Sequence, residues 1–324
     1  MTRTLLAVGL MAGVSVTALS ATAQQWNMAT PYSDVVFHTQ NVIEFAADVA
    51  EATGGDFEIT VHSGGSLIPH PSIKRSIQDE VVEIGEVLIS LLQNEDALFG
   101  LDAIPFLATS YDQAWALWEA SRPAIEEALA EDGLTLLYAV PWQPQGFYTT
   151  VALASGDDLS GLRFRTYNAA TARLAELLGS VATQVETPEI PQAFATGMVE
   201  AMVTSSATGV SSQAWDFVDY FTEVNAWLPK NMVVVNTRAF DRLDETTQSA
   251  LLAAAATAEA RGWQMSEDLN ASLIATLVEN GITVEAPTAA LDGTLSEIGG
   301  TMTGEWLAAT GETGEAIIAA YHAN

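Results

Sequence analysis

Segments with strand character alternate with helical segments along most of the chain, and this order constrains the fold more than any other feature. Residues 57–61 alternate apolar and polar side chains, and 81–89 form a second strand-like run. Helical spacing of apolar residues occupies 34–52 before them and 72–79 between them. Strands that alternate with helices predict an α/β protein with a mostly parallel sheet and helices on both faces.

A second unit with the same alternation of strands and helices begins near Gly146. Two such units predict a two-lobed periplasmic binding protein type of fold, with a hinge, a long connecting helix and a ligand cleft between the lobes at the carboxyl ends of the strands. We expect lobe 1 to comprise 24–145 plus about 229–270, and lobe 2 to comprise 146–228 plus about 271–324. Further expected elements are helices at 112–121, 123–132, 169–178, 188–196 and 213–221, a short strand or loop at 103–107, strands at 134–140, 147–152, 162–166, 198–204 and 232–236, and a long helix with Asp244 as its N-cap.

The first 23 residues read as a secretory signal peptide. Arg3 precedes an apolar stretch from Leu5 to about Ala18, and Ala21-Thr22-Ala23 has the small-x-small form of a cleavage site. The stretch of about 14 apolar residues is shorter than the roughly 20 that cross a bilayer. The chain is therefore expected to be exported to the periplasm, without direct membrane insertion.

The charge balance excludes several classes of partner. The 324 residues carry 41 Asp and Glu against 11 Lys and Arg, for a formal net charge of −30, and contain no cysteine. Such a surface repels nucleic acid and anionic lipid, and the lack of thiols excludes disulfides, thiolate metal sites and a lipoprotein anchor. We interpret the acidic surface as an adaptation for solubility in a saline habitat.

Motifs of catalysis are missing from the sequence. There is no G-x-S-x-G elbow, no phosphate-binding glycine loop and no H-E-x-x-H pair. The four histidines are scattered without metal-ligand spacing, and only His70, flanked by Pro69 and Pro71, falls near the predicted cleft edge. The sequence therefore predicts no catalytic residue, no metal site and no cofactor.

The scarce basic residues are more informative. Three of the 11 fall within 162–173: Arg163, Arg165 and Arg173. A guanidinium at the carboxyl end of a strand can bind a carboxylate through two parallel charge-assisted hydrogen bonds. Each arginine can instead pair with an acidic residue of the fold, an alternative that is strongest for Arg163 and Arg173.

Residues 158–165 read DLSGLRFR and are followed by NAAT at 168–171. This run resembles the "DLKGLKIR" segment of the solute-binding subunits of TRAP transporters, the DctP family. Further similarities are Thr53-Gly54-Gly55, GSL at 65–67, IPFL at 104–107 and GMVE at 197–200. The resemblance implies a two-lobed receptor that delivers a small organic acid to small and large TRAP membrane subunits, with Arg165 bound to the ligand carboxylate.

Departures from the family pattern narrow the expected ligand. Thr204, followed by Ser205, replaces the asparagine that usually supports the carboxylate, and Tyr148 occupies a position where some relatives carry a second cation. Trp142 and Phe147 place aromatic rings nearby. One guanidinium with aromatic walls predicts a monocarboxylate with an apolar or aromatic body. The candidate substrate-binding residues are Arg165, Tyr148, Thr204, Trp142, Asn168, Phe147, Ser205, Leu88, Ser90 and His70.

Two other functions stay open at the level of sequence. Aromatic walls in an acidic protein also suit a cationic or zwitterionic solute held by cation–π contact. A secreted α/β hydrolase is the more remote alternative, because it requires a nucleophile and a base for which the sequence offers no motif.

Overall fold

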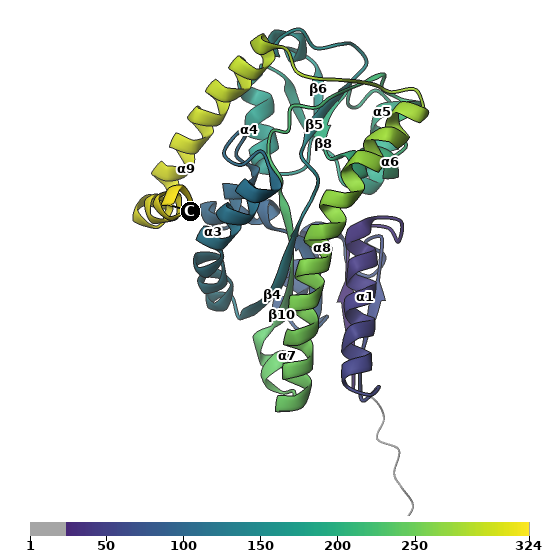
Figure 1. The fold of residues 1–324 in the computed structure, drawn as a ribbon, viewed down its shortest axis with the longest axis vertical. Coiled ribbons are helices and arrows are strands. Elements are labelled where there is room, and N and C mark those ends of the chain that lie inside the picture. The colour runs from purple at the N-terminus through teal and green to yellow at the C-terminus, as the bar shows by residue number, and fades with distance from the viewer. Residues whose placement is uncertain (1–23, 324) are drawn as a thin grey trace, which may run out of the picture.

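Two separate sheets form the centres of two α/β lobes in the computed structural model, which describes residues 24–323 (Figure 1). The predicted α/β class and two-lobed architecture are confirmed. The predicted signal peptide, residues 1–23, lies outside the described residues. Within them, no helix combines the length and the apolar character needed to cross a membrane.

The first sheet has the strand order β2-β1-β3-β10-β4. Its first three strands pair in parallel, whereas β10 runs antiparallel to both β3 and β4. The strands are β1 (Gln24–Ala29), β2 (Phe57–His62), β3 (Ile84–Leu88), β4 (Leu134–Pro141) and β10 (Lys230–Asn236).

The second sheet has the order β11-β9-β5-β8-β6-β7, and here β5 runs antiparallel to its two neighbours. The strands are β5 (Gly146–Thr149), β6 (Arg163–Thr166), β7 (Val181–Gln184), β8 (Ala201–Thr204), β9 (Tyr220–Thr222) and β11 (Thr283–Glu285). Both sheets are thus mixed. The antiparallel strands, β5 and β10, each come directly after the chain has crossed from one lobe to the other. They therefore begin at the cleft, where their neighbouring strands end.

Two long helices connect the lobes (Figure 1). Helix α8 packs on α1 and β4 of the first lobe and then on α6 and β11 of the second. Its predicted N-cap is confirmed, because the Asp244 carboxylate accepts the backbone N–H groups of Thr246 and Thr247. Helix α9 starts beside the 3₁₀ turn Gly156–Leu159 and then packs on α3. The helices are α1 (Phe37–Ala52), α2 (Ile73–Gln78), α3 (Tyr111–Glu131), α4 (Ala169–Leu177), α5 (Ile190–Ala195), α6 (Ser206–Ser211), α7 (Thr237–Asp241), α8 (Glu245–Glu279) and α9 (Ala289–Ala323), the last broken by a kink at Gly311, whose φ is 57°.

Two local predictions are wrong. The expected pair of helices around Pro123 is the single helix α3, since Leu117 and Trp118 before the proline and Ile125 and Leu129 after it belong to one buried stripe. Packing on the core therefore outweighs the hydrogen bond that proline removes. Residues 213–221 do not form a helix. They contain the 3₁₀ turn Ala214–Asp216 and then β9, which pairs with β5 and β11.

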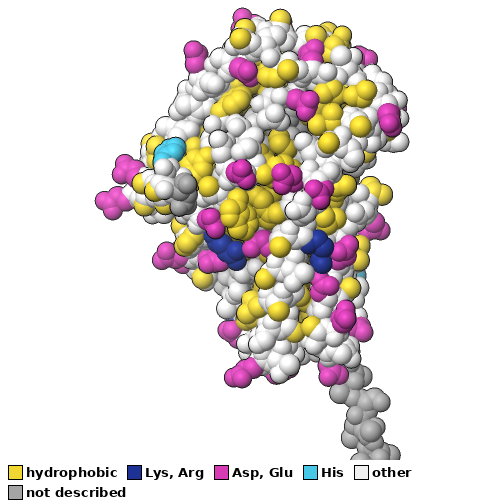
Figure 2. Space-filling view, in the orientation of Figure 1, with side chains coloured by type: hydrophobic (Ala, Val, Ile, Leu, Met, Phe, Trp, Pro, Cys, Tyr) yellow, Lys and Arg dark blue, Asp and Glu magenta, His cyan; other side chains and the backbone are white. Residues whose placement is uncertain are grey.

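The acidic surplus lies on the surface. Asp and Glu side chains are spread over the face in Figure 2, whereas Lys and Arg appear there in only a few places. Several of the arginines bind nearby acids, as in the pairs Arg163–Glu200 and Arg173–Glu305, at 2.8 and 2.7 Å. The alternative interpretation of Arg163 and Arg173, pairing within the fold, is therefore the one that the structure supports.

Candidate functional site

A cavity lies between the lobes at the carboxyl ends of the strands. It contains about 410 Å³ of space free of protein atoms, including its open mouth. Leu88 at the end of β3 lies on one side, and Tyr167 and Thr204 at the ends of β6 and β8 lie on the other. The lining residues are Tyr32, His70, Leu88, Trp142, Gln145, Arg165, Tyr167, Glu186, Thr187, Thr204, Ser205, Thr208 and Pro229.

Arg165 is the basic residue of this cavity. Its side chain is only 2% exposed, its Nε donates to the Val185 carbonyl at 2.9 Å, and its guanidinium lies 4.9 Å from the ring centre of Tyr167. Every other Lys and Arg within residues 24–323 has a carboxylate oxygen within 4.0 Å, whereas Arg165 has none. The cavity therefore holds a desolvated cation that no carboxylate of the described protein neutralises.

Burial lowers the pKa of Arg165 to about 10, because a charged guanidinium is disfavoured away from water. The residue stays protonated at neutral pH. A buried charge without a counterion is costly to the fold, and an anionic ligand recovers part of that cost when it binds.

Hydroxyl groups lie at the end of β8. Thr204, Ser205 and Thr208 all line the cavity. The Ser205 Oγ accepts the Thr208 backbone N–H at 3.1 Å, and its carbonyl accepts the Tyr148 hydroxyl at 3.1 Å. These contacts hold the segment in place, so its hydroxyls are positioned before a ligand arrives.

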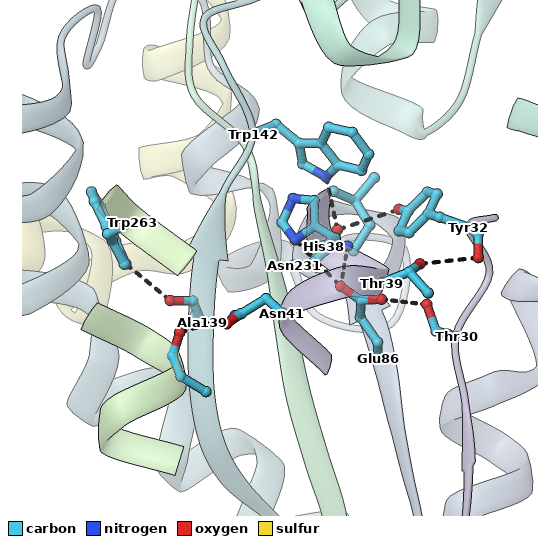
Figure 3. Close-up of polar contacts among 12 residues, drawn as sticks. Thr30, Tyr32, His38, Thr39, Asn41, Glu86, Ala139, Trp142, Asn231 and Trp263 are labelled. Carbon is cyan, nitrogen blue, oxygen red and sulfur yellow. Dashed lines mark hydrogen bonds and ion pairs between the residues drawn. The ribbon is translucent and has the colours of Figure 1, made fainter. Parts of the chain in front are cut away.

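Two aromatic rings form the wall on the side of the first lobe. Trp142 and Tyr32 pack edge to face with ring centres 4.9 Å apart. The Trp142 Nε1 and the Tyr32 hydroxyl both donate to Asn231 Oδ1, at 3.0 and 3.3 Å (Figure 3). One amide oxygen therefore sets the orientation of both rings.

Asn231 is itself held by a buried carboxylate (Figure 3). Glu86 is 2% exposed and accepts hydrogen bonds from the Asn231 amide at 2.8 Å and from the Thr30 hydroxyl, and His38 Nδ1 lies 3.3 Å away. Burial acts to raise the pKa of Glu86, but the hydrogen bonds from His38, Thr30 and Asn231 keep it below its ordinary value. An ionised Glu86 thus stabilises the aromatic wall from behind.

Six of the ten predicted residues line the cavity: Arg165, Thr204, Ser205, Trp142, Leu88 and His70. The other four do not. Phe147 packs on Phe164 in the core, and Tyr148 packs on Phe221 behind the cavity.

Asn168 and Ser90 contact each other across the lobes. The Asn168 amide donates to Ser90 Oγ at 2.8 Å, and the nearby backbone N–H of Ala170 donates to Gln93 Oε1 at 3.0 Å. Both predicted residues are therefore placed where the lobes meet, rather than on the cavity lining.

Sequence reasoning missed seven lining residues. Tyr167 lies two residues after Arg165 on the same strand face, and Tyr32 follows β1 at its carboxyl end. Because the ligand cleft is expected at the carboxyl ends of the strands, their positions in the sequence indicate both residues. Glu186 and Thr187 follow β7, a strand that the sequence pattern did not reveal. The remaining three are Gln145, Thr208 and Pro229.

The part of the chain that the structure describes holds no group of three or more His, Asp or Glu side chains suited to a metal ion. The lining instead combines one cation, one carboxylate, hydroxyls and aromatic rings. Such a set can bind a small polar molecule with an apolar body.

Comparison with known proteins agrees with this architecture. Residues 28–297 match the family described as bacterial extracellular solute-binding protein, family 7 (DctP). A Bordetella pertussis extracytoplasmic solute receptor that binds pyroglutamic acid is 45% identical, with a TM-score of 0.92 over 93% of this chain and 100% of its own. A marine metagenome TRAP solute-binding protein specific for pyroglutamate is 39% identical, with a TM-score of 0.92 over 94% and 100%.

A solute-binding protein from Albidiferax ferrireducens is 22% identical over 229 residues, which are 69% of this chain and 67% of that protein. The family match covers well over half of the chain, and the solved relatives share both its sequence and its fold. The protein therefore belongs to family 7 of the bacterial extracellular solute-binding proteins, the receptors of TRAP transporters, which bind solutes and are not enzymes.

Proposed function

We propose that this receptor captures a small cyclic monocarboxylate of the pyroglutamate type between its lobes in the periplasm, and delivers it to the TRAP membrane subunits. Arg165 carries the proposal. It is the basic residue that is buried in the cavity without a carboxylate partner among residues 24–323. A ligand carboxylate completes this pair through charge-assisted hydrogen bonds.

The rest of the lining supports the same ligand class. Trp142 and Tyr32 provide apolar faces for the body of the ligand, and the Thr204 and Ser205 hydroxyls lie on the lining of the second lobe. Relatives at 45% and 39% identity bind pyroglutamate, a carboxylate on a five-membered lactam ring. A cationic solute, by contrast, has to place its charge in the same cavity as a buried guanidinium.

A panel of ligands tests this function. We expect saturable, one-to-one binding of pyroglutamate by calorimetry, and at 100 times the Kd a stabilisation of about 2.7 kcal/mol in thermal unfolding. Choline, galacturonate and glutarate serve as cationic, sugar-acid and dicarboxylate controls. Stabilisation by choline alone, or by none of the carboxylates, would contradict the proposal.

The pH dependence of binding should report the charge of Arg165. Its pKa of about 10 in the unliganded protein means that the guanidinium loses its proton, and its attraction for a carboxylate, as the pH rises through 10. Burial raises the pKa values of Tyr32 and Tyr167, so these neighbours stay neutral over the same range. Calorimetry should show constant affinity from about pH 6 to about 9 and a loss of roughly tenfold per pH unit above about 10. Constant affinity up to about pH 11.5 would contradict this assignment.

A further inference from the structure

Among the described residues that line the cavity, Glu186 is the only Asp or Glu. It follows Val185, whose carbonyl accepts the hydrogen bond from Arg165 Nε. The same short segment after β7 therefore both holds the cation and adds an anion to the cavity. A negative charge in the cavity repels a ligand carboxylate, so carboxylate binding alone does not explain the presence of Glu186.

The nearest charged or titratable partner of Glu186 is His70, on the opposite lobe. The Leu88 backbone N–H donates to His70 Nε2 at 3.3 Å, so Nε2 is the unprotonated nitrogen and the proton is on Nδ1. That Nδ1 lies 3.7 Å from Glu186 Oε2, which is longer than a hydrogen bond. With His70 at this distance and the Gln184 side chain as a further hydrogen-bonding neighbour, the carboxylate keeps unused accepting capacity.

Glu186 is also ionised at neutral pH. Its side chain is 28% exposed. Burial acts to raise its pKa, but the neighbouring His70 and the charge of Arg165 keep that pKa below its ordinary value. An ionised carboxylate only accepts hydrogen bonds, so a ligand group that faces it has to be a donor.

We infer that Glu186 is a specificity-determining residue that accepts a hydrogen bond from an N–H group of the ligand and rejects ligands with a second carboxylate. The inference rests on the proposed function, because Arg165 has to bind the ligand carboxylate for the rest of the ligand to face Glu186. The selected class is carboxylates with a nearby amide or lactam N–H. A ligand with a ring oxygen or a methylated nitrogen at that position has no hydrogen to donate to Glu186. A ligand with a second carboxylate there is repelled by the negative charge of Glu186.

The test compares ligands that differ only at the ring donor. Calorimetry on the full receptor uses pyroglutamate, its N-methyl derivative and the lactone 5-oxotetrahydrofuran-2-carboxylate. We expect the wild-type protein to prefer the lactam over the lactone by roughly 10- to 100-fold, the value of a hydrogen bond to a charged group. In Glu186→Gln, whose amide can either accept or donate, the preference should fall below about threefold, and affinity for glutarate should rise several-fold.

Glu189→Gln is the matched control, since it removes a charge from an exposed side chain three residues away and should leave the preference unchanged. If Glu186→Gln weakens all ligands equally, or keeps the wild-type preference, the side chain acts only as an interlobe contact of His70 and the inference fails, while carboxylate binding at Arg165 stands. A wild-type protein without lactam preference also overturns it. Failure of all three cyclic acids to bind overturns the proposed ligand class together with this inference.

Discussion

Replacing Arg165 with methionine should weaken the binding of a carboxylate ligand by about 10² to 10⁴-fold. Methionine retains an apolar stem in the cavity but offers no hydrogen-bond donor, so the ligand carboxylate loses two charge-assisted hydrogen bonds, each worth roughly 1.5–3 kcal/mol. The carboxylate also loses its counterion in a site shielded from water. Calorimetry with pyroglutamate measures the change, and unchanged affinity would contradict the assignment of Arg165 as the ligand anchor.

The same substitution should not destabilise the unliganded protein. Because burial lowers the pKa of Arg165 to about 10 in the folded state, the charged form is disfavoured by the fold, and the unfolded state binds more protons between this pKa and the ordinary value. At neutral pH that corresponds to a cost on the order of 3 kcal/mol, which a neutral side chain avoids. The melting temperature of Arg165→Met without ligand should therefore equal or exceed that of the wild type.

Arg163→Met is the control on the same strand. Arg163 is about half exposed and pairs with Glu200 on the surface. Exposed pairs contribute about 0–1 kcal/mol, so neither stability nor ligand affinity should change much. Loss of binding in both variants would indicate a general disturbance of β6 instead of a missing ligand contact.

Replacing Gly299 with alanine should destabilise the fold by about 1–3 kcal/mol. Gly299 lies in the part of α9 that packs on the first lobe, and a Cβ at this position would sit 2.2 Å from the backbone oxygen of Pro105. That carbonyl belongs to a rigid turn: Phe106 has a φ of 60°, and its N–H donates to the Ala226 carbonyl at 2.7 Å. Neither backbone can yield without loss of a contact, so α9 has to move away from the turn.

The adjacent Gly300→Ala is the matched control. A Cβ on Gly300 meets no atom within 4 Å, and alanine favours the helix over glycine by roughly 0.5–1 kcal/mol. Thermal or urea unfolding should therefore shift in opposite directions for the two neighbouring substitutions. Equal stabilisation by both would show that α9 does not approach the turn as closely as the structure places it.

Much of the fold follows from local patterns in the sequence. Alternating strand and helix signals lead to two α/β lobes, and Asp244 marks the start of α8. The wrong predictions of secondary structure fall where contacts with residues distant in the sequence determine the local conformation. Pro123 normally ends a helix, yet α3 continues because the apolar residues on both sides of the proline bury the same stripe. Residues 213–221 do not form the predicted helix; the chain instead makes a 3₁₀ turn at Ala214–Asp216 and then enters β9 at Tyr220, where β5 and β11 offer backbone partners.

The sequence likewise predicts some residues of the candidate site and misses others. The scarcity of basic residues and the strand-end position singled out Arg165, and the resemblance to the DctP family supported it. The sequence predicts Tyr148 and Phe147 at the ligand, but both lie in the core of the second lobe. Glu186 had no signal of its own, since an acidic residue is unremarkable in a chain with 41 of them.

The sequence by itself determined the alternation of elements, the acidic character of the chain and the few positions where a cation can stand, because these depend on residue type and spacing alone. Only the tertiary structure decided which charges are neutralised. Arg163 and Arg165 lie two residues apart on one strand, yet Arg163 reaches Glu200 on the surface and Arg165 is buried in the cavity with no carboxylate within 4.0 Å among the described residues. Pairing depends on what the other lobe and the neighbouring strands place nearby, and no local pattern encodes that.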